Sequence, residues 1–149
     1  MPEPDVIPMS SLSLSAAQRL AEAAISAARS HGVAVCVAVT DPSGEPIVTM
    51  RMDEAPRLSA EIARNKAYTV ASFNGLPTHL WWPVIADDPA LVHGITQTPR
   101  LVIFGGGVPV LVNGAVVGAV GVSGGSSEQD RAIAEAAAAA ISPSHEISG

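Results

Sequence analysis

The chain of 149 residues is poor in aromatic side chains and in charge. Aromatic residues make up 3% of it and charged residues 15%, against about 25% charged in an average soluble domain. So few rings argue against a stacking platform for single-stranded nucleic acid. A net charge of −6 without a basic cluster argues against sequence-independent binding of nucleic acid or of an anionic membrane. The low charge content favours self-association, since further copies of the chain can then cover part of the surface.

A single cysteine, Cys36, excludes an internal disulfide bond and a zinc site built only from cysteines. It lies in the apolar run 33–39, where a buried and unreactive thiol is the simplest interpretation. No run of about 18 apolar residues is present to span a membrane. The first residues, 1–5, carry acid where a secretory signal peptide is basic. We therefore expect a cytoplasmic protein.

Local patterns predict one α+β domain over residues 13–142, after an irregular arm (1–12) and before a loose tail (143–149). Helices are expected over about 15–31, 59–73 and 126–141, with short helical turns between 78 and 94. Strands are expected over about 33–40, 47–52, 101–104, 108–112 and 115–122. Ser15 with Gln18, and Ser126 with Gln129, have the spacing of capping boxes. Asn113-Gly114 is typical of a two-residue hairpin turn, so the sheet should be antiparallel.

Lys66 is the only lysine of the chain, and helical spacing places it on the side of its helix that carries Ile62 and Phe73. If it is buried there, its pKa is lowered, and it could serve as a base, form an imine or hold a carboxylate. The alternative is a lysine whose head reaches solvent past an apolar stem. Arg64 and Arg100 could pair with a ligand carboxylate in the same way.

A second group of candidates lies between residues 79 and 93. His79 and His93 are of the residue type that ligates haem iron and transfers protons near neutral pH. Trp81 and Trp82 offer flat walls to a planar ligand. Asp87, or the aspartate that follows it, could hold a protonated partner. The spacing fits no compact zinc motif. The alternative is that the histidines flank an interface that the tryptophans stabilise.

Glycine-rich turns form a third group. The run 105–107 is no phosphate loop, because a strand follows it instead of a helix. Gly106 and Gly107 instead allow a backbone or a ligand to approach closely. Ser123 and Gly124 join a strand to a helix N-terminus, where free amides favour an anion such as a carboxylate. Ordinary helix capping is the alternative there.

Four runs of residues together resemble the GlcG/HbpS family of haem-binding-type proteins. They are IARNKAYT (62–69), GGGVPV (105–110), NGAVVGAVGVSG (113–124) and EQD (128–130). This family includes the C-terminal domain of PduO-type corrinoid adenosyltransferases. The resemblance extends over about residues 12–142. It implies homo-oligomers and a profilin-like or PAS-like fold, in which helices flank a five-stranded antiparallel sheet. It assigns no axial ligand, because haem ligation in this family is not tied to one motif position.

Several functions remain open at this point, because a fold does not fix a function. The first is a ligand-binding domain in a homo-oligomer that takes haem or a similar planar, carboxylate-bearing ligand, with His79 or His93 as the iron ligand. The alternative is a cofactor-independent lyase, isomerase or hydrolase for a small organic acid or aromatic metabolite. Lys66 or a histidine would then move the proton. A third is a structural protein whose assembly is its function.

Overall fold

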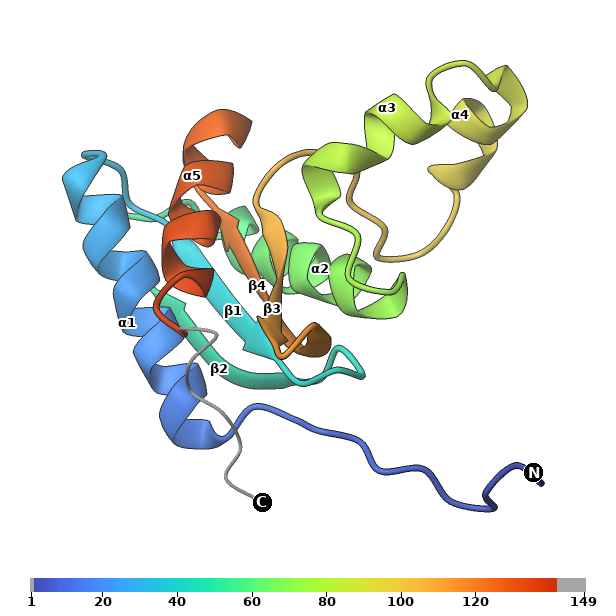
Figure 1. The fold of residues 1–149 in the computed structure, drawn as a ribbon. Coiled ribbons are helices and arrows are strands. Elements are labelled where there is room, and N and C mark those ends of the chain that lie inside the picture. Colours follow the sequence, from blue (N-terminus) through green and yellow to red (C-terminus); the bar gives the residue numbers. More distant parts are fainter. Residues whose placement is uncertain (1, 142–149) are drawn as a thin grey trace.

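The computed structural model describes residues 2–141 and shows three layers, with an antiparallel sheet between helices (Figure 1). Helices α1 and α5 cover one face of the sheet, and helix α2 covers the other. The helical elements are α1 (Leu14–Ser30), α2 (Leu58–Ser72), the 3₁₀ turn η1 (Thr78–Leu80), α3 (Trp81–Ile85), α4 (Pro89–Ile95) and α5 (Ser127–Ala138). The strands are β1 (Cys36–Thr40), β2 (Pro46–Arg51), β3 (Gly107–Val112) and β4 (Ala115–Ser123). The predicted α+β class is confirmed.

The strand order is β2-β1-β4-β3, so the two hairpins lie side by side and β2 and β3 form opposite edges. Asn113 and Gly114 connect β3 to β4 with φ angles of 52° and 79°. Positive φ at both central residues is what a tight hairpin turn of the I′ type requires. The hairpin predicted from this dipeptide is therefore confirmed.

The sheet has four strands within residues 2–141, not the five that were expected. Segment 101–104, predicted as a strand, pairs with none of the described strands. The amide of Val102 instead donates a hydrogen bond to Thr69 Oγ1 on α2 at 3.0 Å. An apolar run forms a strand only beside a free sheet edge, and this run lies over a helix.

Helix α1 begins earlier than the predicted capping box at Ser15. The Leu12 amide donates to the Val117 carbonyl at 3.0 Å, which holds the chain beside β4 up to that residue. Ser13 then caps the helix, because its hydroxyl accepts from the Ala16 amide at 3.1 Å. Ser15 lies in the first turn. At α5 the predicted capping box of Ser126 and Gln129 is present, with both reciprocal bonds formed.

The two faces of the sheet are packed differently. Between the sheet and α1/α5 lies a core of branched aliphatic side chains with alanine, including the wholly enclosed Leu20 and Ile133. Between the sheet and α2 the buried side chains are mostly alanine, with Cys36 among them. A Cβ on Gly121 would collide with the Ala63 carbonyl of α2. Small residues thus let α2 lie close against the sheet.

The face predicted for α2 is buried at Lys66, Thr69 and Val70 but not at its end, where Phe73 is 53% exposed. Ala63 and Ala67 complete the enclosed face. Lys66 therefore points into the α2 side of the sheet.

Residues 78–104, with η1, α3 and α4, form an arm that projects from the layered part of the molecule (Figure 1). Helix α4 has no buried residue. No helix within residues 2–141 has both the length and the apolar character needed to cross a membrane.

Candidate functional site

Lys66 is fully enclosed and makes its polar contacts with the protein itself. Its Nζ donates to the Val122 carbonyl at 2.8 Å and to Asp130 Oδ2 at 3.1 Å. The exposed fractions of the Lys66 and Asp130 side chains are 0% and 4%. The other carboxylate oxygen of Asp130 accepts from the Gly125 amide at 2.8 Å. This buried ion pair joins α2 to the end of β4 and the first turn of α5.

Gly106 is the residue that makes room for the ammonium group. A Cβ at this position would lie 2.6 Å from Lys66 Nζ and 2.5 Å from the Val122 carbonyl oxygen. Its φ of +128° is also one that other residues rarely adopt. The sequence predicted that the glycine run allows a close approach, and the group that approaches is Lys66.

Burial lowers the pKa of Lys66, and the carboxylate of Asp130 partly opposes this shift. A lowered pKa was predicted for a buried lysine. With no exposed surface, however, the ammonium group is out of reach of a substrate or a ligand carboxylate. Asp130 is its partner, and no local pattern in the sequence indicated that the two residues meet.

His79 lies on η1 against the start of α5. Its Nδ1 atom is buried and has no hydrogen-bond partner within residues 2–141, while the side chain as a whole is only half-buried. Burial lowers the pKa of His79, the Arg131 guanidinium lowers it further, and Glu135 raises it. The imidazole is therefore held in its neutral form, which is the form that ligates metals.

Gly105 separates His79 from α5: a Cβ on it would lie 3.6 Å from His79 Cβ and 3.4 Å from Arg131 Cβ. Phe104 is 50% exposed, and its ring centroid lies 5.1 Å from Lys66 Nζ. We call His79, Phe104, Gly105 and Arg131 the His79 surface. Arg131, which the sequence analysis missed, is exposed and binds Glu135 at 2.8 Å.

The two tryptophans have different surroundings. Trp81 is 4% exposed and packs against Phe73, with ring centroids 4.8 Å apart. It lines a hollow of about 180 Å³ that Tyr68 and Leu101 also border. Trp82 is 54% exposed on the arm. Both tryptophans were predicted to form walls for a ligand. Trp81 lines this hollow, whereas Trp82 does not.

Other candidates are spread over the surface. His93 and Asp87 are exposed on the arm. Arg100 stacks on Tyr68, with its guanidinium carbon 3.8 Å from the ring centroid. Its Nε donates to Asn65 Oδ1 at 3.0 Å. Within residues 2–141 no three His, Cys, Asp or Glu side chains lie close enough to hold a metal ion together.

At the predicted anion site the free amides are already used. The Gly125 amide donates to Asp130, and the Ser126 amide donates to Gln129 Oε1 at 2.9 Å. Ser123 is buried at the end of β4. A Cβ on Gly124 would lie 2.5 Å from the Ala34 carbonyl oxygen. The capping alternative therefore describes this turn.

Gly107 has a structural role of the same kind. Its amide donates to Thr78 Oγ1 at 2.8 Å, and a Cβ would lie 2.8 Å from the Lys66 carbonyl oxygen. The glycine run thus packs η1, α2 and β3 together. Because η1 precedes α3, this packing also fixes where the His79 surface and the arm begin.

A family model described as "Haem degrading protein HbpS-like" matches residues 12–139. The chain belongs to the HbpS-like family. The resemblance that the four sequence runs carry is thereby confirmed.

The HbpS-like relatives include an uncharacterized 15.0 kDa protein in the dhaT-dhaS intergenic region of Citrobacter freundii. It is 41% identical over 131 residues, covering 87% of this chain and 91% of the relative. A double mutant of HbpS from Streptomyces reticuli has a solved structure with a TM-score of 0.82 and 34% identity, covering 95% of this chain and 94% of that chain. A PduOC structure determined as a haem complex has a TM-score of 0.80 and 36% identity, covering 89% and 96%.

Proposed function

We propose that the chain is a haem-binding domain, and that haem or a similar planar, carboxylate-bearing ligand binds at the His79 surface. The observation that carries this proposal is the half-buried His79 imidazole, whose pKa is lowered and which is therefore neutral. Its buried Nδ1 atom has no partner in residues 2–141, so turning the ring toward a ligand breaks no hydrogen bond of that atom. The haem complex of the PduOC relative supports the choice of ligand.

The residues on either side of Gly105 suit the two parts of such a ligand. The exposed ring of Phe104 offers an apolar contact to a porphyrin. Arg131 can pair with a ligand carboxylate in exchange for its exposed partner Glu135, a role that the sequence analysis gave to Arg64, Lys66 or Arg100. Among the histidines predicted as iron ligands, His79 is favoured over the exposed His93, because the bond from the Gly107 amide to Thr78 Oγ1 ties η1 to β3 beside it. Haem would supply the iron chemistry, while the protein supplies the ligand and excludes water.

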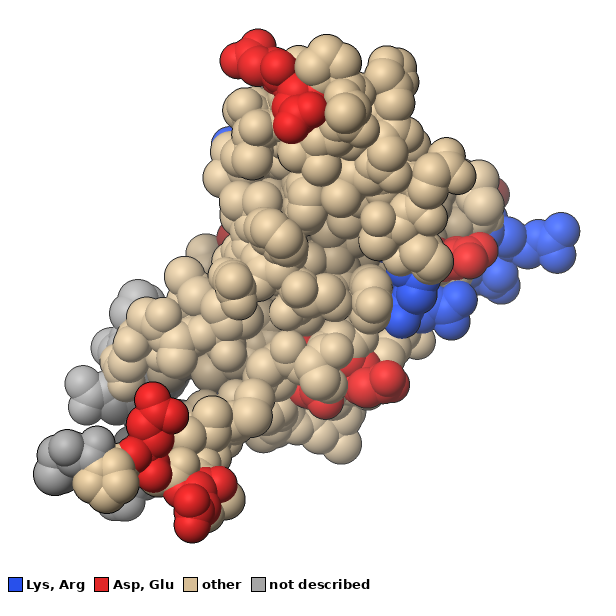
Figure 2. All heavy atoms as spheres, turned by 90° about the vertical axis from the view of Figure 1, so that its right-hand side faces the viewer, with Lys and Arg blue, Asp and Glu red and all other residues tan. Residues whose placement is uncertain are grey.

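We further propose that the domain works as a homo-oligomer. The residues of the His79 surface do not line the hollow of about 180 Å³ beside Trp81, so a porphyrin at that surface needs walls from elsewhere. Figure 2 shows a broad central surface free of charge on the side where the arm projects. Exposed apolar side chains on the arm include Leu80, Trp82 and Val84. A second copy could cover them and enclose the ligand.

A haem titration of tag-free protein, followed by visible absorption, tests the proposal. We expect a saturable Soret shift that His79→Ala abolishes and His93→Ala leaves in place. Absence of a saturable shift would refute haem binding. A shift lost only in His93→Ala would move the iron ligand to the arm.

The cofactor-independent enzyme stays a prediction. It relied on Lys66 or a histidine as the acid-base group, and Lys66 is enclosed and paired with Asp130. His79 is half-buried, while His93 and Asp87 are exposed on the arm.

A further inference from the structure

A cavity of about 280 Å³ lies between α2 and the strand β2, on the opposite edge of the sheet from β3 and the adjoining His79 surface. Helix α2 packs mainly over β4, β1 and β3 and barely reaches β2. Two small side chains, Cys36 on β1 and Ala60 on α2, border the space that remains. The cavity thus follows from the offset of α2 across the sheet.

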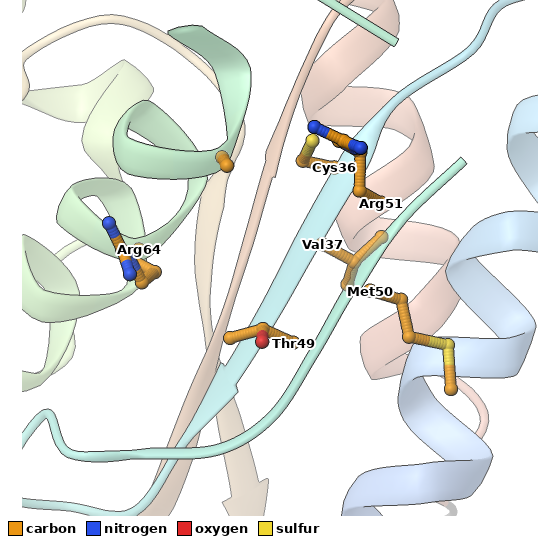
Figure 3. Close-up of a pocket in the computed structure, with 7 residues that line it drawn as sticks. Cys36, Val37, Thr49, Met50, Arg51 and Arg64 are labelled. Carbon is orange, nitrogen blue, oxygen red and sulfur yellow. The ribbon is translucent and has the colours of Figure 1, made fainter. Parts of the chain in front are cut away.

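Strand register determines which side chains line this cavity. Cys36 stands directly opposite Arg51, and Thr49 stands opposite Ala38, so all of these residues face α2. On the helix side, Arg64 follows Ala60 by one turn and therefore lies on the same face. Figure 3 shows Arg51 beside Cys36 on the sheet side, with Arg64 on the helix side. Two arginine side chains from different elements, both of them exposed, thus line one cavity.

Neither arginine is neutralised by the described part of the chain. The ion pairs within residues 2–141 are Lys66–Asp130 and Arg131–Glu135, so neither Arg51 nor Arg64 has a carboxylate partner there. Burial raises the pKa of the Cys36 thiol, and Arg51 opposes this only in part. The thiol is therefore uncharged at neutral pH. Two positive charges border a cavity that no acidic side chain lines, in a chain whose net charge is −6.

We propose that this cavity binds a small organic acid through one or two carboxylates. Guanidinium groups hold carboxylates with two parallel charge-assisted hydrogen bonds. Thr49 adds a hydroxyl group and Ala60 adds an apolar wall for the carbon skeleton, whereas the Met50 side chain points to the other face of the sheet, toward α1. At about 280 Å³ the cavity lies at the lower end of the roughly 300–1,000 Å³ typical of ligand pockets, which suits a small metabolite and not a porphyrin. This site is independent of the His79 surface.

Calorimetric titration of tag-free protein with succinate and with benzoate tests the site, and succinamide serves as the uncharged control. We expect saturable binding of at least one of the two acids at one molecule per chain, and none of succinamide. Arg51→Gln and Arg64→Gln should each raise the Kd about tenfold or more, since each removes a charged hydrogen-bond donor. Arg57→Gln should change it less than about twofold, because Arg57 is exposed but does not line the cavity.

Thermal unfolding provides a second readout, because a ligand that binds only the folded chain stabilises it. The bound acid should raise the melting temperature, and this rise should disappear in Arg64→Gln. Two results would overturn the proposal: no binding of either acid at millimolar concentration, or binding that Arg57→Gln weakens as much as Arg64→Gln. His79→Ala should bind the acid like the unaltered chain, so a failure of haem binding leaves this test intact.

Discussion

Breaking the buried ion pair by Lys66→Met should destabilise the fold severely. The two side chains are 0% and 4% exposed and the charged atoms lie 3.1 Å apart, so removing the ammonium group strands the Asp130 carboxylate away from water. Removing one partner of a buried pair costs about 3–5 kcal/mol. Domains of this kind have an unfolding free energy of only about 5–15 kcal/mol. Taking 2 kcal/mol per M as a typical urea dependence, we expect the unfolding midpoint to fall by about 2 M.

The matched change is Asp130→Asn. Its amide oxygen can still accept from the Gly125 amide, but Lys66 is then left with the Val122 carbonyl as its polar partner in the described residues. The double variant Lys66→Met/Asp130→Asn removes both charges. It should therefore lose less stability than the two single variants added together, and less than Lys66→Met alone.

Urea unfolding, followed by tryptophan fluorescence and circular dichroism, gives the free energy of each variant. If Lys66→Met lowers the free energy of unfolding by less than about 1 kcal/mol, the lysine is not buried as an ion. Strict additivity of the two single changes would show that the residues do not interact in solution.

Three further predictions concern other features. Gly106→Ala should destabilise by about 1–3 kcal/mol in urea, because of its φ of +128° and the contact with Lys66 Nζ, whereas Gly94→Ala, which meets nothing within 4 Å, should be close to neutral. Because burial lowers the pKa of His79 in the folded state, the unfolded chain takes up that proton first, so stability should be lost as the pH falls below about 6.5. His79→Gln should flatten this part of the pH dependence of the urea midpoint, and an unchanged slope would contradict the assignment. Trp82→Glu should reduce the mass measured by light scattering, whereas Leu14→Glu, on α1, should not; equal masses would remove the arm from the interface.

Features decided by neighbouring residues were predictable from the sequence. The Asn113-Gly114 turn needs only two residues with positive φ, and the Ser126/Gln129 box closes within one helical turn. Where several serines alternate, at 11, 13 and 15, the sequence could not choose the cap. The choice depends on the Leu12 amide, which bonds to Val117, more than a hundred positions away.

The same limit applies to the predicted strand and to the candidate site. Segment 101–104 has strand-forming residues, but a strand also needs a free edge, and the Val102 amide finds Thr69 instead. Arg131 could not be predicted as a site residue, because an exposed arginine on a helix has no distinguishing pattern and its proximity to His79 depends on the fold. The cavity at Arg51 and Arg64 depends on the offset of α2 over the sheet, which no local pattern encodes.

The resemblance itself can be explained from these contacts. Its runs 62–69 and 128–130 contribute Lys66 and Asp130, and its run 105–110 contributes Gly106, which leaves room for the ammonium group. Lys66, Gly106 and Asp130 of these runs therefore meet at a buried joint between α2, β4 and α5. Such a joint fixes the fold and holds α5, and with it Arg131, next to His79. It does not determine what the exposed groups bind, so the ligand must be settled at His79 and at the Arg51/Arg64 cavity, one site at a time.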